Sequence, residues 1–100
     1  MPNLVSIENF GFSNCYAIKK VFLSKVEKIT HASFLGCRSL TDFTAINVKK
    51  VEDYAFQSCV VLESLNMPKL EYIEARAFWL CPKIRSIFAP KITTYKCECQ

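Results

Sequence analysis

The chain has 100 residues, 51% of them hydrophobic, and a formal charge of +4 from 13 basic and nine acidic residues. This length suits one small domain, and the high hydrophobic content excludes an intrinsically disordered protein. The charge is mild and scattered along the chain, so it only weakly favours anionic partners and says nothing about the fold.

The segment that follows Met1 has no basic region, no apolar run and no cleavage site of the kind found in signal peptides. No stretch approaches the ~20 consecutive apolar residues of a membrane span. We therefore expect the chain to be cytoplasmic by default, or to be a piece of a longer array whose targeting signals lie elsewhere.

A repeat of 22 residues runs through the sequence. Two residue types recur four times at this interval without an insertion: Phe12, Phe34, Phe56 and Phe78, and Cys15, Cys37, Cys59 and Cys81. Such a period predicts a stack of one supersecondary unit in which neighbouring copies bury each other. We divide residues 1–100, as a single array, into repeats 4–25, 26–47, 48–69 and 70–91, with a partial fifth repeat over 92–100.

The spacing of apolar residues within one repeat predicts its local structure. Leu62, Leu65 and Met67 end in an alternating pattern that is typical of a short strand with one buried face. Pro68 follows directly and ends the strand, because proline cannot donate into a sheet. The three-residue interval from Phe78 to Cys81 predicts a helical or 3₁₀ turn. Each repeat should then be a strand, a corner, an extended return and a helical turn, with the strands parallel in one continuous sheet.

The phenylalanine and cysteine columns are the predicted structural core of the stack. We expect the four cysteines of the column to be buried free thiols, because cysteine packs well as a small hydrophobic residue. Disulfides between adjacent repeats are the alternative, since neighbouring rungs can fall within bridging distance. The absence of a secretory signal favours the reduced form.

The columns resemble a known family. The pattern is carried by Leu62, Leu65, Met67, Pro68, Leu70, Ile73, Ala77, Phe78 and Cys81, and it resembles the BspA-like (treponemal-type) leucine-rich repeat. The Ala-Phe-x-x-Cys motif fits well at 55–59 and 77–81, and more loosely at 11–15 and 33–37. The commoner leucine-rich repeat has asparagine where this chain has Val26, Val48 and Leu70, so no asparagine ladder is expected.

The resemblance implies an α/β-type repeat solenoid, a right-handed leucine-rich-repeat superhelix. A parallel sheet would line its concave side, and short helical or 3₁₀ turns the other side. Proteins of this type are not enzymes as a class, and many act at cell surfaces in adhesion or host-matrix binding. The resemblance therefore implies no cofactor, and it leaves the cell surface open as the location.

The predicted concave face carries the candidate partner-binding residues. They are Phe22, Thr44, Asn66 and Phe88, next to a column of Lys20, Asp42, Ser64 and Ser86. The two phenylalanines are candidate aromatic anchors, although scattered exposed apolar side chains are also normal in proteins. A broken stripe of Lys25, Lys69 and Lys91 is more typical of solubility than of binding to nucleic acid or an anionic glycan.

No catalytic or metal-binding constellation is visible in the sequence. His31 is the only histidine, and its varied column predicts a solvated surface residue rather than a catalytic base. Glu52 and Glu74 lie one repeat apart and are expected to be a solvated edge rather than a glycosidase pair. Cys97 and Cys99 lack the further ligands that a zinc site needs.

The C-terminal segment 97–100, Cys-Glu-Cys-Gln, has the outline of a prenylation box, although its middle residues fit poorly. The alternative is a frayed or truncated end. Membrane attachment is expected only if Cys97 is lipidated. Neither end of the array carries a polar cap, which favours either a longer array or end-to-end self-association.

The sequence thus predicts a non-enzymatic interaction module that binds a protein or glycan through its concave face. The alternative hypothesis is a structural spacer within a longer surface or intracellular array, with no ligand of its own. The identity of the ligand is not encoded in the repeat.

Overall fold

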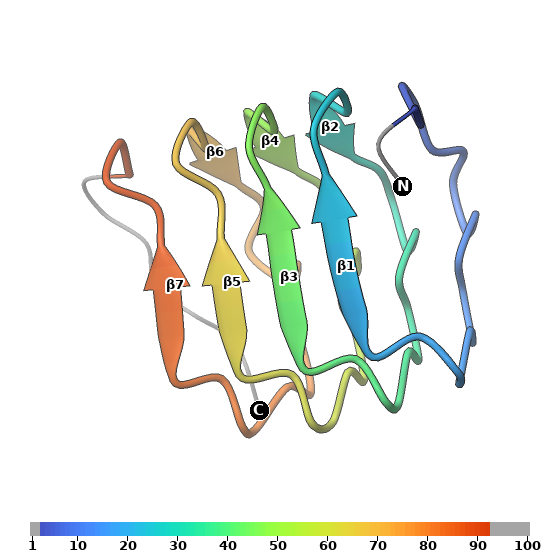
Figure 1. Cartoon of the computed structure of the whole chain (residues 1–100). Helices are drawn as coiled ribbons and strands as arrows, with labels where there is room; N and C mark the ends of the chain where they lie inside the picture. The colour runs from blue at the N-terminus through green and yellow to red at the C-terminus, as the bar shows by residue number, and fades with distance from the viewer. Residues whose placement is uncertain (1–2, 93–100) are drawn as a thin grey trace.

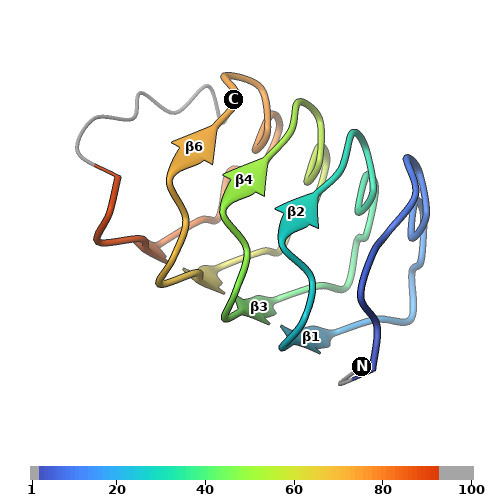
Figure 2. The ribbon, with the colours of Figure 1, turned by 90° about the horizontal axis from the view of Figure 1, so that it is seen from above.

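The computed structural model describes residues 3–92, which wind into a parallel β-solenoid of about three turns (Figure 1). One side of the coil is a four-stranded sheet in the order β1-β3-β5-β7. Its strands are β1 (Lys20–Leu23), β3 (Asp42–Ala45), β5 (Ser64–Asn66) and β7 (Ser86–Phe88). The other side is a three-stranded sheet of β2 (Lys28–Ile29), β4 (Lys50–Val51) and β6 (Tyr72–Ile73). Figure 2 shows the two sheets on different sides of the winding chain.

All the strand pairs are parallel, and every register joins residues 22 apart in the sequence. In the four-stranded sheet Val21 pairs with Phe43, Phe43 with Leu65, and Leu65 with Ile87. The expected parallel sheet is therefore confirmed. The expectation of a single sheet is wrong, because the extended return of each repeat also pairs with its neighbours and forms the three-stranded sheet.

The expected helical turns are not found within residues 3–92, which contain no helix. The segments 9–14, 31–36, 53–58 and 75–80 form successive hydrogen-bonded turns instead. In the first of them, Gly11 N–H donates to the Glu8 carbonyl at 2.9 Å, within the repeat, whereas Phe12 N–H donates to the Ser33 carbonyl at 2.7 Å, in the next repeat. A helix would satisfy its N–H groups internally. These turns send alternate N–H groups to the neighbouring repeat, and this continues the ladder between the sheets.

The alternation depends on left-handed backbone at two positions of each of the first three turn segments and at one position of the fourth. Phe10 and Asn14 have φ of 61° and 60°, and the equivalent residues of the later repeats follow the same course. They are Ala32, Gly36, Tyr54, Ser58 and Leu80. Glycine holds this conformation without strain at Gly36, and a Cβ added there would collide with the side-chain oxygen of Asn14.

The core is a continuous apolar column between the two sheets. The phenylalanine rings stack nearly parallel, with centroids 5.3 Å apart for Phe12–Phe34, 5.6 Å for Phe34–Phe56 and 5.2 Å for Phe56–Phe78. Phe43 packs edge-on against Phe34 and Phe56. Phe34, Phe56 and Phe78 are fully buried, while Phe12, in the first repeat, is only partly buried.

Candidate functional site

The four candidate binding residues lie in one row across the four-stranded sheet, which we call the outer row. Phe22 pairs with Thr44, Thr44 with Asn66, and Asn66 with Phe88. The alternate residues of each strand are packed in the core, so the outer row faces away from it. Phe22 and Phe88 are 49% and 57% exposed, and three strand spacings separate them, or roughly 14 Å.

Weak ion pairs border the outer row. The Lys20 ammonium lies 3.9 Å from the Asp42 carboxylate, and the Arg85 guanidinium lies 4.0 Å from the Glu63 carboxylate. All four side chains are about half exposed or more, so these pairs contribute little to stability. The face therefore offers two exposed aromatic rings, two uncharged polar side chains between them, and charges of both signs along one side.

The structure corrects the expectation for the only histidine. His31 was expected to be a solvated surface residue, but its ring packs edge-on between Phe10 and Tyr54, with both centroid distances at 5.6 Å. The reason is local: its backbone N–H donates to the Glu52 carboxylate at 2.9 Å, and this holds the turn against the next repeat.

The two glutamates are likewise more than a solvated edge. Glu52 accepts the His31 N–H, and Glu74 accepts the Asp53 N–H at 2.7 Å. Each carboxylate therefore caps a donor of the preceding repeat. Lys28 and Lys50 add ion pairs to Glu52, at 3.7 and 3.8 Å. Within residues 3–92 no three His, Cys, Asp or Glu side chains gather in a group that could hold a metal ion.

A second aromatic cluster, which the sequence analysis missed, follows the turn segments. It consists of Phe10, His31, Tyr54 and Trp79, and the Tyr54 and Trp79 rings are 5.9 Å apart. Arg76 lies over the Tyr54 ring and also donates to its hydroxyl at 3.1 Å. These residues do not share one column of the 22-residue repeat. Comparing equivalent positions therefore could not group all four, whereas the aromatic types at positions 6–10 of successive repeats offered a weak signal.

The thiol column is reduced and hydrogen-bonded. Cys15, Cys37, Cys59 and Cys81 are free thiols in the described part of the chain. The Cys59 thiol donates to the Phe34 carbonyl at 3.1 Å, and the thiols of Cys37 and Cys81 donate to the equivalent carbonyls one repeat back. Interaction with the neighbouring thiols, together with burial, raises the pKa of the Cys59 thiol far above its ordinary value. Three of these cysteines, Cys37, Cys59 and Cys81, are buried in the core, where their thiols bond to backbone carbonyls.

The lysine stripe is interrupted in the structure as it is in the sequence. The Lys69 ammonium donates to the Asn47 side-chain oxygen at 2.7 Å, and Asn47 occupies the position at which the other repeats have lysine. The stripe is thus tied into contacts between repeats. The candidate lipidation site at Cys97 lies outside the described residues.

Among the described residues there is no helix with the length and apolarity that crossing a membrane requires. Neither a comparison with curated proteins nor one with solved structures found a match. The comparison with protein families did: residues 1–99 match the family described as BspA type leucine rich repeat region (6 copies). The repeat register, the parallel strands and this match agree, and the chain belongs to the BspA-type leucine-rich repeat family.

Proposed function

We propose that this chain is a non-enzymatic binding module and that it holds its partner, a protein or a glycan of a glycoprotein, on the outer row of the four-stranded sheet. The family is generally non-catalytic and is consistent with a binding role. The observation that carries the proposal is the register, which brings Phe22 and Phe88 into one row with Thr44 and Asn66 on a single solvent-facing surface.

The chemistry of the outer row suits a contact of this kind. Half-exposed phenylalanines lose water-facing apolar area when a partner covers them, and large aromatic residues are frequent energetic centres of interfaces. Thr44 and Asn66 lie between them and supply a hydroxyl and an amide, which can donate and accept hydrogen bonds. The outer row lies on hydrogen-bonded, paired strands, so forming this contact requires little ordering of the backbone.

Binding can be tested with a panel of purified matrix glycoproteins and a glycan array, using biolayer interferometry on the full chain. We expect a ligand from these sets to bind, and Phe22→Lys and Phe88→Lys to weaken it at least about tenfold, as expected for residues at the centre of an interface. The matched controls are Val60→Lys and Leu80→Lys, which change residues of similar exposure, 41% and 40%, away from the outer row. Circular dichroism checks that each variant is folded.

The spacer hypothesis predicts a different outcome. A structural spacer binds nothing in these sets, or binds equally well with and without the two lysine substitutions. Either result would reject the outer row as the binding surface.

A further inference from the structure

The second aromatic cluster forms a surface of its own along the turn segments, separate from the outer row. From Phe10 to Trp79 its successive ring centroids are 5.6, 5.6 and 5.9 Å apart. Phe10 is 56% exposed, and the other three side chains are partly exposed. His31 and Tyr54 belong to inner repeats that have a described repeat on each side, so their exposure arises on the flank of the solenoid and not at an end.

The backbone beneath the cluster fixes the spacing of its rings. The Phe10 N–H donates to the His31 carbonyl at 3.1 Å, and the Tyr54 N–H donates to the Arg76 carbonyl at 3.2 Å. Such bonds hold neighbouring repeats at the strand spacing of about 4.8 Å. Phe10 and Tyr54 occupy the same position of the repeat, two repeats apart, and the small, buried Ala32 lies between them. Two spacings therefore separate these residues along the stack, or about 9.6 Å.

The two residues are held in an unusual conformation. Phe10 and Tyr54 have φ of 61° and 60°, in the left-handed region that bulky residues rarely adopt. Glycine or asparagine would hold this backbone more easily. Backbone strain of this kind gathers at functional sites. Large rings at these positions therefore point to a use for the rings themselves.

We propose that the second aromatic cluster binds a proline-rich peptide segment of a partner protein in the polyproline II conformation. This helix advances about 3.1 Å per residue, so prolines three residues apart lie about 9.3 Å apart on one side of it. That distance matches the spacing of two repeats. The peptide runs along the stack, with one proline on the Phe10 ring and the next on the Tyr54 ring. Aromatic surfaces recognise such segments at low entropic cost, because the helix is already formed in the free peptide.

The polar groups beside the rings suit the same ligand. A polyproline II segment has no internal hydrogen bonds, and its prolines offer carbonyl oxygens but no N–H. The cluster supplies donors: the Arg76 guanidinium lies over the Tyr54 ring, 5.8 Å from its centroid, and also donates to the Tyr54 hydroxyl at 3.1 Å. Both the guanidinium and the hydroxyl carry protons that can bond to a carbonyl of the peptide.

A glycan suits this surface less well, because its hydroxyl groups also need acceptors. The carboxylates of this region are already engaged with the backbone of neighbouring repeats. Glu52 accepts the His31 N–H, Glu74 the Asp53 N–H, and Asp53 the Arg76 N–H. The surface thus offers rings and donors, which match a ligand of apolar rings and carbonyl oxygens.

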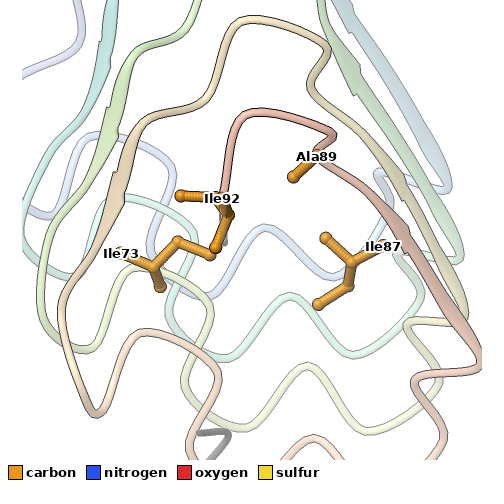
Figure 3. Close-up of a pocket in the computed structure, with 4 residues that line it drawn as sticks. All are labelled: Ile73, Ile87, Ala89 and Ile92. Atoms are coloured by element: carbon orange, nitrogen blue, oxygen red, sulfur yellow. The ribbon is translucent and has the colours of Figure 1, made fainter. Parts of the chain in front are cut away.

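The described residues also line a cavity of about 200 Å³, but its chemistry differs from that of the cluster. Ile73, Ile87, Ala89 and Ile92 surround it (Figure 3), and none of these four side chains is polar. All four pack against the core, and the chain continues beyond Ile92. The cavity is therefore the end of the described core, whereas the second aromatic cluster lies on the flank.

The spacing can be tested with two synthetic peptides of equal composition, Pro-Ala-Ala-Pro-Ala-Ala-Pro-Ala-Ala and Pro-Ala-Ala-Ala-Pro-Ala-Ala-Ala-Pro. Trp79 is the only tryptophan of the chain, so its fluorescence reports on the cluster alone. We expect a saturable change in its emission on titration of the full chain, with the first peptide binding at least about threefold more tightly. No saturable change, or equal affinity for the two peptides, would overturn the proposal.

Substitutions test the two rings. Phe10→Asn and Tyr54→Asn place a residue that tolerates left-handed backbone, so both variants are expected to fold, which circular dichroism checks. Each should weaken binding of the fluorescein-labelled first peptide at least about fivefold in fluorescence anisotropy. Tyr72→Asn is the matched control, because it removes a ring of similar exposure, 55%, from β6. It should leave the affinity within about twofold, as should Phe22→Lys in the outer row. Affinity that Tyr54→Asn leaves unchanged would overturn the proposal.

NMR of the full chain locates the bound peptide. His31 is the only histidine, so its imidazole signals and the indole N–H signal of Trp79 are assigned without ambiguity. We expect both to shift on titration with the first peptide, and binding that leaves them in place would overturn the proposal. The β-1,4-linked glucose hexamer is the glycan probe. Shifts with this hexamer and none with the peptide would identify a glycan as the ligand, and would overturn the proposal equally.

Discussion

At position 59 the side chain must be small, apolar and able to donate one weak hydrogen bond, and cysteine meets all three conditions. Its thiol is fully buried and donates to the Phe34 carbonyl of the preceding repeat. We expect Cys59→Ala to lower the free energy of unfolding by about 1–2 kcal/mol, through the lost hydrogen bond and a small cavity. Urea denaturation measures this. Cys15→Ala is the control, because Cys15 is only partly buried, and an equal loss there would contradict the role of the thiol column.

The same residue makes stability depend on alkaline pH. In the unfolded chain the Cys59 thiol loses its proton near its ordinary pKa of 9.0, whereas in the folded chain the raised pKa keeps it protonated. The unfolded state therefore binds fewer protons above that pH, so the stability is fully present below pH 9 and falls as pH rises. Unfolding curves at pH 8 and pH 10 should show a steeper loss for the native sequence than for Cys59→Ala, and parallel losses would refute the assignment.

At the scale of the repeat element, the aromatic column sets the register of the stack. Phe56 stacks between Phe34 and Phe78 and also meets the edge of Phe43. We expect Phe56→Ala to cost about 3–5 kcal/mol, because a buried ring is replaced by a cavity. Gln57→Ala, at the next and partly exposed position, should change stability by less than about 0.5 kcal/mol. Thermal denaturation of both variants tests this, and similar shifts in Tm would contradict the packing.

The turn element carries strain that a substitution can relieve. Leu80 has φ of 61° and a side chain that is 40% exposed, while Asn14 holds the equivalent position of the first repeat. A non-glycine residue in this conformation costs about 1–2 kcal/mol, and asparagine tolerates it better than leucine. We expect Leu80→Asn to raise the free energy of unfolding by up to about 1 kcal/mol. Val60→Asn changes an equally exposed residue outside the left-handed positions and should not stabilise the chain.

These turns also mark the limit of prediction from the sequence. The three-residue interval from Phe78 to Cys81 correctly predicted that both side chains lie in the core. The same interval does not distinguish a helical turn from a turn with alternating backbone hydrogen bonds. Left-handed backbone at positions such as Ser58 and Leu80 distinguishes these turns from a helix. Serine and leucine rarely adopt this conformation, so the residue types do not predict it. The strand columns were predictable because a strict period permits only one register.

The candidate site divides in the same way. Phe22 and Phe88 could be placed on one surface from the period alone, because the register follows from it. The packing of His31 between Phe10 and Tyr54 could not. It joins residues 21 and 23 apart, which meet only because the turns rotate neighbouring positions toward each other. Comparing equivalent positions of the repeats therefore predicts surface features that recur in every repeat. It misses contacts between residues at different positions of neighbouring repeats.

At the scale of the whole molecule, stability should vary along the stack. In a repeat protein each unit is held by its neighbours, so inner units gain two interfaces and terminal units only one. Among the described residues, β3 and β5 each pair on both sides, whereas β7 pairs with β5 alone and Ile87 is only partly covered. We therefore expect β7 to open locally more readily than β3 and β5.

Native-state amide hydrogen exchange measures this gradient directly. We expect the backbone amides of β3 and β5 to exchange on the order of tenfold more slowly than those of β7, because opening the last strand breaks one interface and leaves the inner ones intact. Phe56→Ala should speed exchange in the inner strands and so flatten the difference, since it weakens the interfaces that protect them. Uniform protection from β1 to β7 in the native sequence would mean that the array opens only as one unit, and the additive description of the stack would then fail.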